Sequence, residues 1–280
     1  MRIVSLNCWV GRALGPLLGF MRWIDADVYC LQEVTWAPKG TPDQCLFKYR
    51  FRNERLKHYN NLYDKLCELL PDHIGSYWPV AEYDVYDDED KPYPIRFGLA
   101  TFVRKNYVFL ENRAPFLHDE FWLTGLRDPP VPSRAHAFEL LRPEVKNTLK
   151  NRLVVAHTHG IWEPGTKEDT PAREEQFEKF ETLIKEMTNP GNPPAVVCGD
   201  FNILPDSKYL ASLKRMRFTE FVGLGNYKST RSSFYTKNPD NNPPYFADYM
   251  LVSDWVKVKN FDVVYDPEVS DHCPLVLDIY

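Results

Sequence analysis

The sequence lacks several features that would place it in a special class. It has no apolar stretch long enough to span a membrane, no internal repeat and no low-complexity linker. Its first residues show no basic segment followed by an apolar core, which is the pattern of a secretory signal. The 280 residues carry a formal net charge of −5. We therefore expect a cytoplasmic protein without a membrane span, and no overall basic field that recruits long duplex nucleic acid, although a local basic cleft would suffice.

Closely spaced cysteines are also missing. The chain has six cysteines and no Cys-x-x-Cys motif. Four of the six lie in or beside apolar runs: Cys8, Cys30, Cys198 and Cys273. This distribution favours buried free thiols in a reducing compartment over a set of disulfides. The 23 prolines and the hydrophobic content of 44% are more typical of a loop-rich enzyme with a large core than of a helical bundle.

Apolar runs of strand length recur along the chain, with few helical patterns between them. They predict strands over 2–7, 28–34, 77–85, 97–104, 107–113, 134–141, 152–159, 194–199, 245–252, 256–264 and 274–279. Apolar residues at helical spacing predict helices over 13–25 and 53–69. A further helix begins at Thr170-Pro171 and ends at Asn189-Pro190-Gly191. We expect an α/β (α+β) fold in which two mixed β-sheets pack face to face with helices outside.

Two segments outside this pattern need a separate interpretation. Residues 38–52 look irregular, and an insertion around 38–75 within a single domain of 1–280 is either a lid or a packing element. Residues 84–90 hold five acidic side chains. Because nothing apolar shields them, we interpret this stretch as a solvated hairpin loop rather than a metal site.

Polar residues stand at the ends of several apolar runs, where α/β folds place their chemistry. The clusters are Leu6-Asn7, Leu31-Gln32-Glu33-Val34, Gly199-Asp200-Phe201-Asn202, Asp248-Tyr249 and Ser270-Asp271-His272. Carboxylate and amide oxygens with one histidine suit a hard metal ion and a phosphoryl group. The sequence therefore points to chemistry on a phosphoester at one end of the predicted sandwich.

These five clusters, in this order from Asn7 to His272, resemble the endonuclease/exonuclease/phosphatase superfamily. The resemblance implies a four-layer, deoxyribonuclease-I-like sandwich and a hydrolase that depends on Mg²⁺ or Mn²⁺. It makes Glu33 the principal metal ligand, with Asn7 and Asp271 near the metal. A lone carboxylate and a neutral oxygen also fit the preference of Mg²⁺ for few protein ligands.

The resemblance also assigns the groups that act on the phosphate. Asp200 would orient or deprotonate the attacking water, and Asn202 would donate to a phosphate oxygen. His272 would bind the scissile phosphate, while Asp248 would fix its tautomer and raise its pKa, as in other His–Asp pairs. His159 would act at the phosphate.

His157 stands where the family usually has Asn, and strand alternation puts it on the same face as His159. We leave its role open, with a two-histidine metal site as the sharper alternative. Arg173 lies on the inward stripe of its predicted helix, so its partner is either a phosphate or a structural carboxylate. We assign it to substrate binding.

The segment 227–235 combines hydroxyls, cations and aromatic rings. Either Arg231 binds a phosphate while an aromatic ring stacks on a base, or the segment is a polar strand with an exposed face. The first motif reads Asn7-Cys8-Trp9, without the acidic third residue of the abasic-site nuclease branch. It is more similar to the deadenylase, sphingomyelinase and phosphatase-like members.

We expect a monomeric phosphodiesterase or nuclease whose partner is a phosphoester substrate, in nucleic acid or a nucleotide. The alternative is a phosphomonoesterase acting on a small molecule or a lipid headgroup. A catalytically silent binding module would have lost Glu33, Asp200 or His272, and all three are present.

Overall fold

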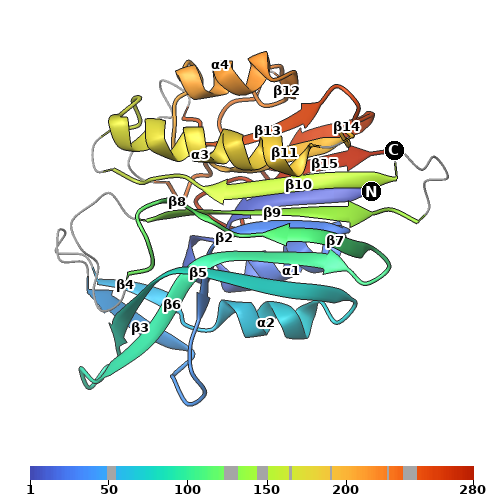
Figure 1. Cartoon of the computed structure of the whole chain (residues 1–280). Coiled ribbons are helices and arrows are strands. Elements are labelled where there is room, and N and C mark those ends of the chain that lie inside the picture. Colours follow the sequence, from blue (N-terminus) through green and yellow to red (C-terminus); the bar gives the residue numbers. More distant parts are fainter. Residues whose placement is uncertain are drawn as a thin grey trace.

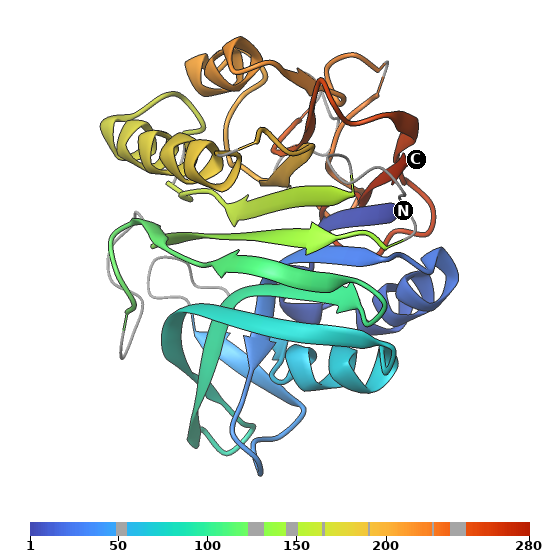
Figure 2. The ribbon, with the colours of Figure 1, turned by 45° about the vertical axis from the view of Figure 1, so that its right-hand side comes forward.

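Two β-sheets pack face to face and helices cover their outer faces in the computed structural model (Figure 1, Figure 2). The structure describes residues 1–48, 55–122, 132–143, 151–163, 166–189, 191–225, 227–235 and 245–280. The predicted fold class and the four-layer arrangement are confirmed. No helix among these residues is long and apolar enough to cross a membrane.

The first sheet has eight strands in the order β14-β15-β1-β2-β6-β5-β3-β4. Their bounds are β1 Arg2–Asn7, β2 Val28–Trp36, β3 Gln44–Lys48, β4 Arg55–Tyr59, β5 His73–Tyr86, β6 Pro92–Arg104, β14 Val258–Val263 and β15 Leu275–Ile279. Helices α1 (Leu14–Ile24) and α2 (Leu62–Leu69) belong to its outer face, where their apolar residues share one core with the outward side chains of β1 and β2.

The second sheet has seven strands in the order β12-β13-β11-β10-β9-β7, with β8 paired to β9. Their bounds are β7 Val108–Arg113, β8 Phe116–His118, β9 Ser133–Leu141, β10 Arg152–His159, β11 Ala195–Asp200, β12 Phe218–Glu220 and β13 Asp248–Ser253. Helices α3 (Pro171–Met187) and α4 (Lys208–Arg215) pack on its outer face. Thr170 caps α3, as predicted, and Pro190 of the predicted helix end lies outside the described residues.

Side-chain alternation sorts the strands into layers. On β10, Leu153 and Val155 face the core between the sheets, whereas Val154 and Ala156 face α3. The other central strands follow the same rule, so every second residue of each strand is aimed at the opposite sheet. Polar side chains that point toward the opposite sheet therefore come close to one another where the ends of neighbouring strands lie together.

The prediction of one helix over 53–69 is wrong. The first described part of that segment is strand β4, which pairs with β3, and only Leu62–Leu69 is helical. Tyr59, Leu62 and Leu66 do share one apolar core, so the stripe was a true signal of burial. The chain turns between them at Asn60, whose backbone N–H donates to Asp43 O at 2.9 Å and whose side chain donates to Pro42 O at 2.7 Å.

Residues 38–52 are not wholly irregular, because β3 occupies Gln44–Lys48, while residues 49–52 lie outside the described part. The acidic stretch does form the turn of the β5–β6 hairpin. There the Asp87 carboxylate accepts hydrogen bonds from the backbone N–H groups of Glu89 and Lys91. The acidic residues thus shape a turn.

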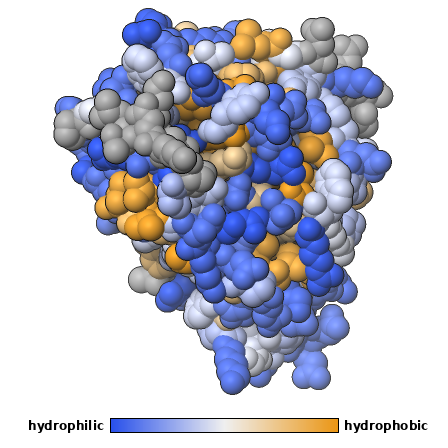
Figure 3. All heavy atoms as spheres, turned by 90° about the vertical axis from the view of Figure 1, so that its right-hand side faces the viewer, coloured by the Kyte–Doolittle hydropathy of each residue, from blue (hydrophilic) through white to orange (hydrophobic). Residues whose placement is uncertain are grey.

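The two ends of the sandwich differ. Figure 3 shows the end that carries both chain termini, where hydrophilic residues cover most of the surface and hydrophobic residues form separate areas. Strands β1 and β10 run away from that end and finish at the opposite one (Figure 1). β1 is parallel to β2 and β10 is parallel to β11, so their carboxyl ends lie together there.

Candidate functional site

The register of the strands places four polar side chains in the inward position at this end. His159 is the partner of Asp200 across β10 and β11, and Asp200 is the partner of Asp248 across β11 and β13. Asn7 ends β1 in the facing sheet, and its Nδ2 donates to Asp200 Oδ2 at 3.1 Å. The two sheets therefore meet through polar groups at this end and through apolar groups further along.

Glu33 reaches the site through a β-bulge. Pairing of β2 with β6 shifts between Leu31 and Val34, and both of these residues face the outer core. Two residues thus occupy the space of one, and Glu33 has a φ of +54°. Within the described parts of the chain its carboxylate makes no hydrogen bond, and it pairs with His159 Nε2 at 3.8 Å. The bulge re-aims a side chain that regular alternation would send toward the helices.

The Gly199-Asp200-Phe201-Asn202 motif has a steric basis. Gly199 has a φ of +137°, and a Cβ there would lie 2.1 Å from Thr158 O on the neighbouring strand, so no other residue fits. Asp200 Oδ1 then accepts from the Asn202 backbone N–H at 3.0 Å. The Asn202 side chain donates to Gly160 O at 3.1 Å. The motif locks both polar residues at the end of β11.

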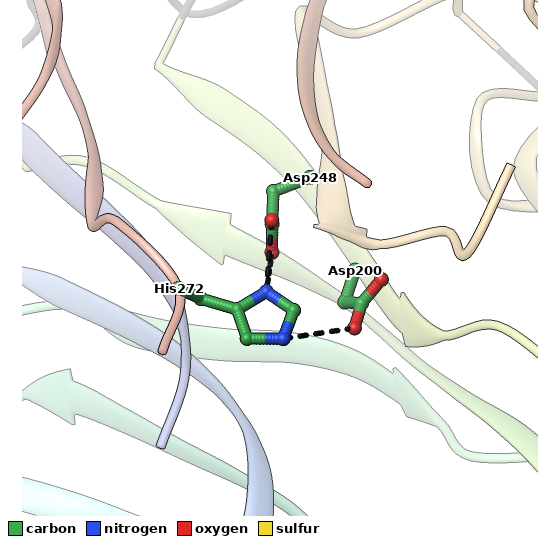
Figure 4. A group of neighbouring side chains, drawn as sticks. All are labelled: Asp200, Asp248 and His272. Atoms are coloured by element: carbon green, nitrogen blue, oxygen red, sulfur yellow. Dashed lines mark hydrogen bonds and ion pairs between the residues drawn. The ribbon is translucent and has the colours of Figure 1, made fainter. Parts of the chain in front are cut away.

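His272 lies between two carboxylates, with Asp248 at one ring nitrogen and Asp200 at the other (Figure 4). Nδ1 is 2.9 Å from both oxygens of Asp248, and Nε2 is 3.5 Å from Asp200 Oδ2. Burial and the Arg231 charge oppose protonation of the ring, but Asp248, Asp271 and Asp200 outweigh them and raise the pKa of His272. The buried Asp248 carboxylate thus fixes the orientation of the His272 ring.

Asp200 is almost fully buried, and burial by itself would raise its pKa. The positive charges of His272, Lys167, His159 and Arg231 outweigh this effect and hold the pKa of Asp200 below its usual range. Asp200 is therefore ionised at neutral pH. A carboxylate of this kind is a weak base and a strong acceptor, which suits it to orienting a water molecule.

Arg231 is brought into the same group by the segment 227–235. Its Nη1 lies 3.0 Å from Asp271 Oδ2 and also contacts His272 Nε2, and its Nη2 lies 4.0 Å from Asp200. The Arg231 side chain is only 8% exposed, and its Nε has no partner among the described residues. The segment is a turn anchored to the Ser270–His272 loop, not the polar strand that we kept as an alternative.

Aromatic rings stand beside this turn. Phe234 is exposed and stacks on Trp9 with ring centroids 5.9 Å apart and an interplanar angle of 19°. The Arg12 guanidinium lies 3.9 Å from the centroid of Trp9 on the same rim. Because Trp9 follows Asn7 by two residues, this aromatic rim lies next to the polar centre and offers a flat surface to a ring-bearing ligand.

Two sets of residues could hold a metal ion. Asp200, Asp248 and His272 have ligand atoms within 4.8 Å of one another. Their geometry is already accounted for by hydrogen bonds between the histidine and the carboxylates. Glu33 fits a hard divalent cation better, since no described group donates a hydrogen bond to its carboxylate and it shares His159 as a partner with the buried acid Asp200. Asn7 lies next to it on the neighbouring strand.

Lys167 was not identified from the sequence as part of the candidate site. It lies in the loop between β10 and α3, and its Nζ donates to Asn202 Oδ1 at 2.6 Å. Burial lowers the pKa of Lys167 to about 7, against the opposing effect of Asp200. No motif marks a single lysine in an acidic, polar loop, so only the fold reveals that it meets the end of β11.

Arg173 is fully buried and pairs with Glu163, 2.9 Å from Nη1. This is the structural-carboxylate alternative that the sequence left open. The guanidinium also donates to the carbonyls of Glu168 at 2.6 Å and Thr166 at 3.0 Å. In this structure its partners are therefore protein groups of the loop that carries Lys167.

His157 is separated from the charged centre although it is on the same face of β10 as His159. Its Nε2 lies 2.8 Å from Thr101 Oγ1 and its Nδ1 lies 3.4 Å from Gln32 Nε2. Burial lowers the pKa of His157 to about 3, so the ring is neutral. Both ring nitrogens of His157 have protein partners. The candidate metal group found among the described residues does not include His157, which disfavours the alternative of a two-histidine metal site.

Comparisons with known proteins agree with this fold. The endonuclease/exonuclease/phosphatase from Bacteroides vulgatus is 18% identical with a TM-score of 0.63, over 100% of this chain and 98% of that one. The human Nocturnin catalytic domain with bound sulfate is 18% identical with a TM-score of 0.63, over 100% and 93%. A Bacteroides thetaiotaomicron mannosyl-6-phosphatase is 17% identical with a TM-score of 0.65, over 100% and 99%.

These likenesses establish the fold. A comparison with curated proteins found no match. The model of the Endonuclease/Exonuclease/phosphatase family matches residues 4–272, which include all five motifs from Asn7 to His272. The resemblance first drawn from those motifs is thereby confirmed, and the chain belongs to the Endonuclease/Exonuclease/phosphatase family.

Proposed function

We propose that this protein is a divalent-metal-dependent phosphodiesterase that hydrolyses a phosphodiester of a nucleotide or nucleic acid by direct in-line attack of water. Membership of the family supports phosphoester hydrolysis in general. The observation that carries the proposal is the ionised, buried Asp200, which is surrounded by His272, His159, Arg231 and Lys167. Such an arrangement suits a water molecule held by the acid and phosphoryl oxygens held by the cations.

Each residue has a role in this proposal. Asp200 accepts a hydrogen bond from the attacking water and aligns it, while Asn7 holds the Asp200 carboxylate in place. His272, oriented by Asp248, and His159 stabilise the charge that develops on the phosphoryl oxygens.

Glu33, Asn7 and Asp271 would hold Mg²⁺ or Mn²⁺. When bound, the metal would supply positive charge to the phosphoryl group and favour ionisation of water. Asp271 now pairs with Arg231, so binding of the metal and substrate would require these two residues to share or exchange partners. Arg231 then becomes available to the phosphate, to which an arginine can donate two parallel hydrogen bonds.

The aromatic rim favours a diester whose leaving or retained group carries a flat ring. Trp9 and Phe234 stand beside the polar centre, where a base could stack on them. The second candidate is a phosphomonoesterase, which the cation Lys167 favours because a monoester carries more charge than a diester. The mannosyl-6-phosphatase of the same fold bears a name of that kind.

The test is Mg²⁺-dependent turnover of a matched panel: bis-nitrophenyl phosphate, nitrophenyl phosphate, single- and double-stranded oligonucleotides and phospholipid headgroups. Glu33→Ala should abolish turnover, and EDTA should do the same until Mg²⁺ is restored. Glu68→Ala, on an exposed glutamate of α2, is the matched control and should be fully active. Turnover of the monoester alone would select the second candidate, and turnover that survives EDTA would contradict the mechanism.

A further inference from the structure

Among the described residues, Lys167 has no carboxylate as an ion-pair partner. Its Nζ donates to the amide oxygen of Asn202, which is neutral, and lies 5.1 Å from the centroid of the Tyr245 ring. None of the described carboxylates forms an ion pair with it, although Asp200 lies near enough to oppose the lowering of its pKa. A desolvated ammonium group with one neutral acceptor has two N–H donors left for a ligand.

The loop that carries Lys167 is held firmly. Arg173 donates to the carbonyls of Thr166 and Glu168, which are the residues on either side of the lysine. The same guanidinium pairs with Glu163 of that loop. At the far end of the loop, Asp169 accepts from Ser207 Oγ at 2.6 Å, which ties the loop to the start of α4.

The hydrogen bonds that fix this loop offset the cost of holding the Lys167 side chain in one place. A lysine side chain has a flexible four-carbon stem, and fixing it costs about 2 kcal/mol in side-chain conformational entropy. A half-buried cation without an ion pair is also costly, so a chain selected only for stability would turn such a lysine to solvent. Here the backbone on both sides is fixed, and the head group is directed to the residue that follows Asp200 by two positions.

Arg231 is a second cation near Asp200. It also lies near Tyr245, with its Cζ 5.7 Å from the ring centroid, and its Nε has no partner among the described residues. Lys167 and Arg231 both lower the pKa of Asp200, so both cations surround the acid. An anion placed against Asp200 would therefore meet a cation from each of two separate loops.

We propose that Lys167 and Arg231 together bind the phosphoryl oxygens of the substrate, and that Arg173 is the positioning residue that presents Lys167 to them. The inference rests on the proposed function for the identity of the site, and it adds a residue and a role for the α3 arginine. An oxyanion that accepts from Nζ supplies the counter-charge that none of the described carboxylates provides.

The experiment measures the affinity of the intact protein for inorganic phosphate by calorimetry at fixed Mg²⁺, with the KM and kcat of the best ester of the panel. Lys167→Met should weaken phosphate binding by about 10-fold to 100-fold, the value of a charge-assisted hydrogen bond. Lys167→Arg keeps the charge and should retain part of the affinity. Lys208→Met, the same change on an exposed lysine of α4, should leave the affinity unchanged.

A double-mutant cycle tests the positioning role. Arg173→Lys keeps a cation for Glu163 but loses the fork that holds both carbonyls, so it should weaken phosphate binding severalfold. If Arg173 acts through Lys167, the double variant Lys167→Met/Arg173→Lys binds phosphate no more weakly than Lys167→Met alone. Additive losses would overturn the positioning role.

Equal phosphate affinity in Lys167→Met and the wild type would overturn the inference, and so would a wild type that binds no phosphate. A loss of kcat with unchanged phosphate affinity would also contradict it, since Lys167 would then act only through Asn202. These outcomes are separable from the proposed function, because ester turnover by the wild type and its loss in Glu33→Ala are measured in the same preparation.

Discussion

Two groups of polar side chains meet around the space between the two sheets, and β10 contributes one histidine to each. We call the first the charged centre; it consists of Asp200, Asp248, His272, His159, Arg231 and Lys167. We call the second the interior network; it consists of Gln32, Thr101, Asn112, His136 and His157. His157 and His159 are two residues apart on one face of one strand, yet they belong to different groups.

The interior network contains only neutral groups with neutral partners. Thr101 Oγ1 lies 2.6 Å from His136 Nδ1 and 2.8 Å from His157 Nε2, and Asn112 is 2.9 Å from the other nitrogen of His136. Burial lowers the pKa of His136 to about 2 and that of His157 to about 3. Both rings are therefore uncharged and their hydrogen bonds are satisfied within the protein.

In the charged centre, Asp200, Asp248 and His272 are buried much as the two histidines of the interior network are, whereas His159, Arg231 and Lys167 are half-buried. The carboxylates of this centre raise the pKa of His272 against burial, and its cations lower the pKa of Asp200 against burial. Lys167 and Arg231 retain donors without described partners. The two groups therefore differ less in burial than in charge: the charged centre holds cations with donors that have no partner among the described residues.

The largest effect should come from removing the charge at the centre. Asp200→Asn keeps the shape of the side chain but removes the acceptor that aligns the water, so kcat should fall by about 10³ or more. Steady-state kinetics on the best ester measures it, and the far-UV circular dichroism should be unchanged. Activity within a few fold of the wild type would remove Asp200 from the reaction and erase the contrast between the two groups.

The next effect concerns the histidine that Asp248 orients. His272→Gln preserves a hydrogen-bond donor but cannot become an imidazolium, and we expect kcat to fall by about 10² to 10⁴. His157→Gln is the matched control on the interior network and should keep its kcat. A comparable loss of kcat in both variants would mean that the two groups act as one.

A smaller effect, on stability rather than activity, should follow from breaking the interior network. Thr101→Val leaves nitrogen atoms of two buried histidines without a partner, which should lower the free energy of unfolding by about 1–3 kcal/mol. Urea denaturation measures this loss, and Thr182→Val on the exposed face of α3 serves as the control. A large drop in kcat with normal stability would assign the network to the reaction.

The last effect, which leaves the stability at neutral pH nearly unchanged, is in the pH dependence of stability, where the groups should act in opposite directions. The raised pKa of His272 gives stability that is full below pH 6.5 and is lost as the pH rises through its folded-state pKa. The lowered pKa of His157 makes the unfolded state bind more protons below pH 6.5, so stability falls as the pH falls toward 3.

Denaturation of His272→Gln and His157→Gln across pH 4–9 tests both signs. Each variant should flatten its own limb of the profile by about 1.4 kcal/mol per pH unit at most. If His272→Gln instead flattened the acid limb, the carboxylates would not be favouring the protonated form of the ring as we infer.

Much of the fold could be predicted because apolar alternation determines which face of a strand is buried. It placed β1, β10 and β11 within a residue or two, and with them Asn7, His159 and Asp200 at the ends of their strands. The β3–β4 hairpin was not predicted, since its strands are rich in charged and polar residues and their pairing is a long-range choice.

The candidate site could be predicted where motifs mark it and not elsewhere. Glu33 was recognised from its motif, but the bulge that aims it was not visible in the residue pattern. Lys167 carries no local signal at all, because its meaning depends on a contact with Asn202 that only the folded loop creates. Arg173 was correctly placed on the inward stripe of its helix, and its partner could be read only from the structure.

The parallel pairs β1–β2 and β10–β11 have one more consequence. The first sheet brings Asn7 and Glu33, the second brings His159 and Asp200, and the final loop brings His272. Neither sheet holds all of these residues, so the proposed catalysis would depend on how the two sheets are aligned. A sliding of one sheet against the other by an ångström would stop turnover while both sheets stayed folded, which makes activity a more sensitive gauge of their alignment than any spectroscopic measure of secondary structure.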